Sequence, residues 1–335
     1  MYESFFGLTG KPFQLNPDPA FFYGSRGHKR AFAYLQYGVH QSEGFIIITG
    51  EVGAGKTTLV RSLLEQIDPS RLIAAQLVTT QLDADDLLRS VGVAFGLPIK
   101  ALDKAQLLAE LEAFLTSLVP HGKRALLIVD EAQNLPARAI EELRMLSNFQ
   151  LGNQGLLQSF LIGQPELRHL MQGPDLQQLR QRVIASYHLG PMDRGETQAY
   201  VEHRLHHVGW NSDPRFEHGA FDAIYTFSGG IPRRINTLCN RVLLAAALSE
   251  DHVISAASVD STADEIRLEL SAGNATAPAA ATPKPEDPGF IGNEPGLGLE
   301  ERVVRLERAM TATLDLLQQL RRTAPGARPP DQVKG

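Results

Sequence analysis

The sequence predicts an α/β protein with a parallel sheet covered by helices on both faces, followed by a smaller helical unit. Three observations support this fold class. An apolar, β-branched run at residues 45–49 enters a glycine-rich turn that opens a helix. Further short apolar runs alternate with segments of helical periodicity. One run, residues 125–129, is apolar throughout, as in a strand that is buried on both faces, and it ends in two acids.

The chain begins with an arm, residues 1–24, which is rich in Phe, Pro and Asp. Its prolines interrupt regular structure, so we expect an irregular but ordered segment. Ser25 is a plausible N-cap for a first helix over residues 26–41. The aromatic side chains of the arm are expected either to bury against this helix or, at Phe22 or Tyr23, to border a bound nucleotide base.

The glycine-rich turn, residues 50–57, reads G-x-x-x-x-G-K-T, and we call it the phosphate loop. Its glycines let the backbone curl so that N–H groups point at phosphate oxygens. Lys56 can reach the β- and γ-phosphates, and the Thr57 hydroxyl can ligate Mg²⁺ beside the positive helix terminus. The pattern therefore predicts ATP and Mg²⁺ as ligands. The expected nucleotide contacts are Gly50, Glu51, Val52, Gly53, Ala54, Gly55, Lys56, Thr57, Thr58 and Tyr23.

The rest of the predicted core follows in alternation. The expected elements are a helix to residue 67, a strand at 72–77, helices at 83–95 and 104–119, a strand at 125–129, a helix from Pro136, a strand at 156–162, a broken helical stretch at 167–182 and a strand at 185–189.

Two acids, Asp130 and Glu131, follow the strand at 125–129. They therefore lie at a carboxyl end of the sheet, where ligands of open α/β sheets bind. Asp130 is expected to hold Mg²⁺, directly or through water, beside Thr57. Glu131 is expected to polarise the attacking water. Together with the phosphate loop, this pair predicts an enzyme that hydrolyses ATP.

The core and its arm are expected to span residues 1–191, and a small all-helical unit to follow at 192–268. Its helices are predicted at 194–208, 215–227, 232–249 and 256–268, with Asp193 and Glu196 forming an N-cap pattern. Residues 269–298 read as a flexible Ala/Pro/Gly-rich linker, and 323–335 as a disordered tail. Residues 299–322 carry a short heptad seam, typical either of a self-associating or partner-binding helix or of a solitary amphipathic one.

Composition sets limits on location and partners. The net charge is −6, so no overall basic field favours nucleic acid. Cys239 is the only cysteine, which excludes an internal disulfide and suits a reducing compartment. The first residues lack a secretory pattern, and no apolar run is long enough to cross a bilayer. We expect a cytoplasmic protein that reaches the inner membrane only through a partner.

Four motifs carry a family resemblance: residues 50–57, 126–131, 161–167 and 230–236. Together they resemble the AAA+ ATPases of the general secretion pathway protein A (ExeA) type, over residues 1–268. The opening residues 1–49 resemble most closely the subgroup that accompanies exosortase/PEP-CTERM and exopolysaccharide loci in bacteria. The resemblance implies a P-loop NTPase core with strand order 5-1-4-3-2 and a helical lid.

The resemblance also implies roles for residues outside the two nucleotide motifs. Gln164 takes the polar sensor position and Arg233 the lid sensor position. Arg182, with Arg180 as the alternative, takes the position of an arginine finger that acts on a neighbouring subunit, which implies a homo-oligomer. By analogy, hydrolysis would drive assembly or export of an envelope component together with an envelope or membrane protein partner.

Two other functions stay open. One is a DNA-associated regulator resembling transposition ATPases, although a basic helix-turn-helix expected after the lid is replaced by the Ala/Pro linker. The other is a slow nucleotide switch that uses residues 299–322 to recruit a partner. A DNA-binding assay at varied salt and a turnover rate would distinguish them.

Overall fold

The computed structural model describes residues 2–275, except for 42, 79–81, 100–101 and 153. The predicted heptad helix at 299–322, the tail at 323–335 and most of the predicted linker lie outside the described residues. None of the described helices is long and apolar enough to cross a membrane.

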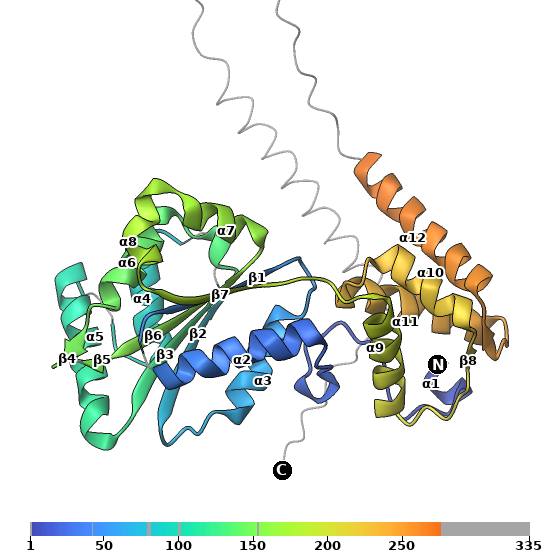
Figure 1. Ribbon diagram of the computed structural model, residues 1–335, viewed down its shortest axis with the longest axis horizontal. Coiled ribbons are helices and arrows are strands. Elements are labelled where there is room, and N and C mark those ends of the chain that lie inside the picture. Colours follow the sequence, from blue (N-terminus) through green and yellow to red (C-terminus); the bar gives the residue numbers. More distant parts are fainter. Residues whose placement is uncertain (1, 42, 79–81, 100–101, 153, 276–335) are drawn as a thin grey trace, which may run out of the picture. The chain divides into compact units, whose positions relative to one another are not determined.

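The core is a parallel sheet of five strands in order β7-β1-β6-β3-β2 (Figure 1). Counted along the chain this is the order 5-1-4-3-2, so the predicted topology is confirmed. The three central strands have almost fully buried side chains, as their apolar composition requires. The strands are β1 (Phe45–Gly50), β2 (Leu72–Val78), β3 (Arg124–Asp130), β6 (Leu157–Gly163) and β7 (Val183–Leu189).

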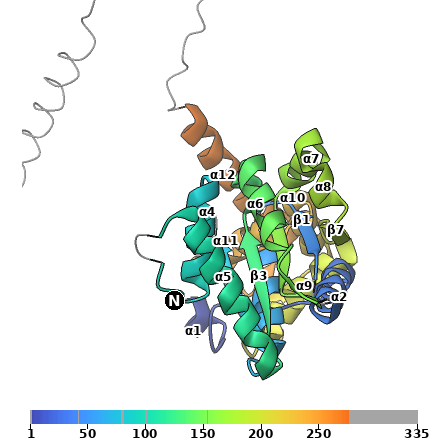
Figure 2. The ribbon, with the colours of Figure 1, turned by 90° about the vertical axis from the view of Figure 1, so that its left-hand side faces the viewer.

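Helices cover both faces of the sheet, and alternate residues of β1 show why. Ile46 and Ile48 pack toward α2 and α3, whereas Phe45 and Ile47 pack toward α4 to α7. Figure 2 shows the two layers on either side of β3. The helices of the core are α2 (Arg26–Gln41), α3 (Lys56–Gln66), α4 (Ala84–Ala94), α5 (Lys104–Leu118), α6 (Ala137–Leu146), α7 (Pro165–Gln172) and α8 (Gln177–Arg180).

Short elements complete the core. Two short antiparallel strands, β4 (Gln150–Leu151) and β5 (Gln154–Gly155), precede β6. The 3-10 turns are η1 (Pro19–Phe21), η2 (Val119–His121), η3 (Ala132–Asn134) and η4 (Pro174–Leu176). The turn η3 follows the two acids directly and positions part of the site described below.

The second unit of the fold, which we call the lid, contains α9 (Arg194–His207), α10 (His218–Ser228), α11 (Pro232–Leu248) and α12 (Ala256–Ala275). Two details differ from the prediction. The lid is not all-helical, because β8 (Arg215–Phe216) and β9 (Val253–Ile254) pair in parallel. In addition, α12 continues past residue 268, so the first residues of the predicted linker are helical.

The N-terminal arm packs differently from the expectation. It begins with a short helix, α1 (Tyr2–Phe5), and the buried side chains of Tyr2, Phe6 and Phe13 share one apolar cluster with lid helices. The arm therefore contributes to the core of the lid rather than burying only against the first helix. Phe22 lies near Phe32 of α2, with ring centroids 6.4 Å apart.

Candidate active site

The phosphate loop joins β1 to α3 and has the backbone that its glycines permit. Gly53 and Gly55 have φ angles of 82° and 98°, which other residues adopt only at a cost in energy. A Cβ at Gly53 would lie 2.3 Å from the Cβ of Arg233, so a side chain there is excluded. Glycine at this position thus allows the lid to approach the loop.

Lys56 lies at the first turn of α3 and is buried. Its Nζ donates to the carbonyl oxygens of Gly50, at 2.7 Å, and Glu51, at 3.0 Å. Burial lowers the pKa of Lys56, although the nearby carboxylates of Glu131 and Asp130 act in the opposite direction. The ammonium group is therefore held at the loop by weak neutral acceptors, which phosphate oxygens can replace.

The two sequence motifs meet at Thr57 and Asp130. The Thr57 hydroxyl donates to Oδ2 of Asp130 at 3.2 Å, although the two residues are far apart in the sequence. Asp130 is buried at the tip of β3, and burial raises the pKa of its carboxyl group. A hydroxyl and a carboxylate beside a glycine cradle are the hard oxygen donors that fit Mg²⁺.

Glu131 follows Asp130 in a left-handed conformation, with φ of 53°. Such strain in a residue with a side chain occurs often at functional sites. Its Oε2 accepts from Gln133 at 2.6 Å and from Gln164 at 3.0 Å. Burial raises the pKa of Glu131, but these two hydrogen bonds and the nearby charge of Lys56 together outweigh it, and the pKa lies below its usual value. Glu131 is therefore an oriented carboxylate.

Gln133 is a residue that sequence reasoning missed. Besides its bond to Glu131, its Oε1 accepts from the backbone N–H of Gln164 at 2.9 Å. The amide thus links the turn after β3 to the N-terminus of α7. Its only sequence signal is its position two residues after the acid pair.

A cavity of about 320 Å³ opens above the phosphate loop, which is the size range of small-ligand pockets. Tyr23 lies in its wall, with its ring centroid 5.9 Å from that of Tyr200 on α9. The predicted residues that line the cavity are Tyr23, Phe22, Val52, Gly53, Gly55, Lys56, Thr57, Thr58, Glu131 and Arg233. The lining residues of the lid that were not predicted as site residues are Tyr200, Arg204, Pro232 and Asn236.

The predicted arginines differ in placement. Arg233, at the start of α11, lines the cavity, and its backbone N–H donates to the Gly53 carbonyl at 3.1 Å. Arg182 instead donates to the carbonyl and hydroxyl oxygens of Ser147, and Arg180 to the carbonyls of Met171 and Gly173. Neither of these two lines this cavity, so they are not brought to the site of their own chain.

Comparisons with known proteins found similar sequences. A family model described as an AAA domain matches residues 39–171. General secretion pathway protein A from Aeromonas hydrophila is 40% identical over 267 residues, covering 79% of this chain and 48% of that protein. The chain therefore spans about half the length of this relative.

Solved structures share the fold at low sequence identity. The Aeropyrum pernix ORC2 protein in ADPNP-ADP complexes has a TM-score of 0.57 at 18% identity, covering 76% of this chain and 71% of that one. Cdc6p from Pyrobaculum aerophilum has a TM-score of 0.55 at 14% identity, covering 75% and 68%. Drosophila ORC bound to DNA has a TM-score of 0.54 at 19% identity, covering 74% and 62%.

Proposed function

We propose that this chain, which matches an AAA domain over residues 39–171 and is similar to general secretion pathway protein A, hydrolyses ATP to ADP and phosphate with Mg²⁺. The observation that carries the proposal is the meeting of the two motifs. The Thr57 hydroxyl lies 3.2 Å from Asp130, and Lys56 of the same turn reaches the mouth of the phosphate loop.

Each residue has a distinct role in this reaction. Lys56 and the loop N–H groups hold the triphosphate, and Thr57 with Asp130 holds Mg²⁺. The bound cation supplies charge neutralisation on the phosphates. Glu131 orients the attacking water and accepts its proton, which suits a carboxylate fixed by Gln133 and Gln164. Tyr23 borders the base. Gln164 and Arg233 sense the γ-phosphate from the core and the lid.

In the cell, hydrolysis would drive assembly or export of an envelope component. The similarity to general secretion pathway protein A supports a secretion-associated ATPase. The opening residues 1–49 favour the exosortase/PEP-CTERM or exopolysaccharide branch of the family. The enzyme would act in the cytoplasm as a homo-oligomer, where Arg182, or Arg180, serves the site of a neighbouring subunit. An envelope or membrane protein would bring it to the inner membrane.

Two variants test the proposed chemistry. Lys56→Ala removes the ammonium group that binds the triphosphate, so both nucleotide binding and turnover should be lost. Glu131→Gln keeps the size of the side chain but removes the proton acceptor, so turnover should fall by about a thousandfold or more while binding persists. The rate of phosphate release with Mg·ATP measures turnover, and binding of a fluorescent nucleotide measures affinity.

The matched control is Glu65→Gln, which makes the same chemical change on the exposed side of α3 and should leave turnover unchanged. Turnover that survives both Lys56→Ala and Glu131→Gln would exclude this active site.

A further inference from the structure

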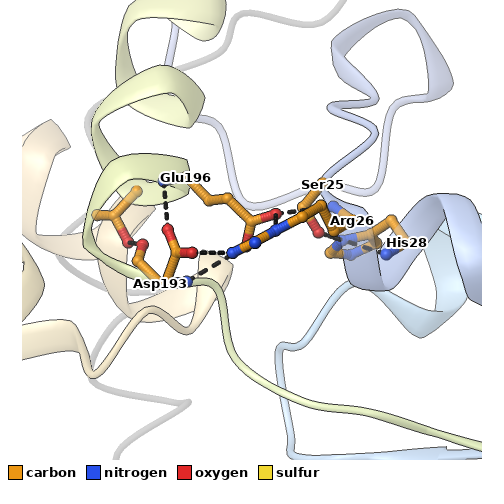
Figure 3. A network of polar contacts seen from close by, with 6 residues as sticks. Ser25, Arg26, His28, Asp193 and Glu196 are labelled. Carbon is orange, nitrogen blue, oxygen red and sulfur yellow. Dashed lines mark hydrogen bonds and ion pairs between the residues drawn. The ribbon is translucent and has the colours of Figure 1, made fainter.

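The first turn of α2 contacts both the phosphate loop and the lid. His28 is buried, and its Nε2 lies 2.9 Å from the carbonyl oxygen of Ala54 in the loop. Its Nδ1 lies 2.7 Å from the hydroxyl oxygen of Ser25. Figure 3 shows Ser25 and His28 together with Arg26, Asp193 and Glu196. No motif of the proposed chemistry includes His28 or Arg26.

One partner of His28 assigns a proton. A carbonyl oxygen can only accept, so Nε2 carries the hydrogen and donates to Ala54. The Ser25 hydroxyl can donate or accept, so it pairs with Nδ1 in either protonation state. Burial lowers the pKa of His28 and favours the neutral ring, although the bond to Ala54 and the carboxylate of Glu196 act in the opposite direction.

The bond to Ala54 fixes the direction of one backbone N–H group in the phosphate loop. In a planar trans peptide, the C=O of Ala54 and the N–H of Gly55 point in opposite directions. With the carbonyl held toward His28, the Gly55 N–H points away from the ring, and Gly55 lines the cavity. The ring is also packed tightly here, because a Cβ at Gly55 would lie 2.7 Å from Nε2.

The first turn of α2 also forms hydrogen bonds and an ion pair with the lid. Oε1 of Glu196 on α9 accepts from the backbone N–H of Arg26 at 2.7 Å and from its Nε at 3.2 Å. The Arg26 guanidinium also pairs with Asp193. Asp193 and Glu196 are the capping box that begins α9, so these contacts hold the N-terminus of a lid helix.

We propose that the first turn of α2 is a connector: His28 is a positioning residue for the phosphate loop, and Arg26 with Glu196 couples the lid to it. The inference rests on the proposed function, because the ligand is Mg·ATP. His28 and Arg26 lie within one turn of a helix, which moves as a rigid unit. A nucleotide that shifts the Ala54 peptide therefore displaces the Glu196 contact, and lid closure in turn orients the Gly55 N–H.

The first half of the test measures nucleotide binding by calorimetry with the nonhydrolysable analogue ADPNP and Mg²⁺. His28→Phe keeps a ring but loses both hydrogen bonds, and should raise Kd about tenfold. His28→Gln keeps an N–H donor and should restore Kd to within about threefold of wild type. Should His28→Phe not fold, Ser25→Ala removes the hydroxyl that orients the ring and is expected to raise Kd about threefold.

The second half measures the lid. Spin labels at Val93→Cys on α4 and Leu248→Cys on α11 use two side chains that are each 63% exposed, whereas the native Cys239 is fully buried. The label distance is measured with and without Mg·ADPNP. Arg26→Ala and Glu196→Gln should each reduce the nucleotide-dependent change to less than about half, and the double variant should add little more.

Arg194→Ala is the matched control. Arg194 is an exposed arginine of α9, the helix that also carries Glu196. It pairs with Asp222 inside the lid, so its loss should leave the nucleotide-dependent change in label distance intact. If His28→Phe binds Mg·ADPNP as tightly as the wild type and Arg26→Ala shows the wild-type lid movement, the connector proposal is overturned and the proposed function stands. A wild-type chain that binds no Mg·ADPNP would overturn the proposed function, and the connector with it.

Discussion

At the scale of single residues, the Glu131 carboxylate depends on amide side chains that come from two different strand ends. Gln133 lies in the turn after β3, and Gln164 follows β6. Both donate to the same oxygen, Oε2. The two bonds fix the orientation of the carboxylate that accepts the proton in the proposed reaction.

Gln133→Ala should lower kcat about tenfold, because it removes one hydrogen bond that orients a charged group, worth about 1.4 kcal/mol. The KM for ATP should stay within about twofold, since Gln133 is not among the residues that line the cavity. Steady-state kinetics measure both values. Gln172→Ala, on the exposed end of α7, is the control. A raised KM with unchanged kcat would contradict the orienting role.

The site residues that could be predicted from the sequence are those that belong to motifs with a fixed spacing of residues. The pattern at residues 50–57 and the acid pair are local, and the parallel sheet brings Thr57 and Asp130 together. Gln133, His28 and Tyr200 could not be predicted, because each makes contacts with a segment that is distant in the sequence. Periodicity gives the face of a helix but not the partner of a single polar side chain.

At the scale of elements, the junction between core and lid depends on Gly230, before α11. Its φ is 74°, and a Cβ there would lie 2.0 Å from the carbonyl oxygen of Met192. The Gly230 carbonyl also accepts from the Met192 N–H at 3.0 Å. The segment that leads into the lid at Met192 and the turn between α10 and α11 thus meet without room for a side chain.

Gly230→Ala should therefore lower the free energy of unfolding by about 3 kcal/mol or more, from the left-handed φ and the displaced backbone together. Gly229→Ala is a close control, because Gly229 has a φ of 58° but nothing lies within 4 Å of its added Cβ. It should cost only about 1 kcal/mol. Urea denaturation measures the free energy of unfolding of both variants. An equal loss of stability in the two would mean that the junction is not tightly packed.

The elements that the sequence predicted are those with long, regular patterns. The helix at 26–41 and the strand order match the structure. The pair β8 and β9 was missed because two residues give no alternation to detect. The packing of the arm against the lid was missed because aromatic residues in an irregular segment indicate burial but not the surface that buries them.

At the scale of the whole molecule, the proposed arginine finger requires a neighbouring subunit. Arg182 and Arg180 are bonded to carbonyls of their own chain and lie outside its cavity. Mixing two kinds of variant subunit tests this requirement. Subunits with Glu131→Gln lack turnover but keep both arginines, and subunits with Arg182→Ala lack the finger but keep Glu131.

Alone, Arg182→Ala should lose about a thousandfold in turnover. Mixed with Glu131→Gln subunits it should regain activity, because the neighbour supplies the arginine. Arg180→Ala in the same assay decides between the two positions, and thermal melting confirms that each variant is folded. If neither variant regains activity in the mixture, the site does not take an arginine from a neighbour.

The central claim is that the phosphate loop holds Mg·ATP through Lys56, and that Thr57 and Asp130 are the residues that would hold the cation. Isothermal titration calorimetry of the pure chain with Mg·ADPNP tests it most directly. We expect about one nucleotide bound per chain in the wild type, and a Kd raised about a hundredfold or more in Lys56→Ala. No heat of binding in the wild type, or an unchanged Kd in Lys56→Ala, would contradict the account.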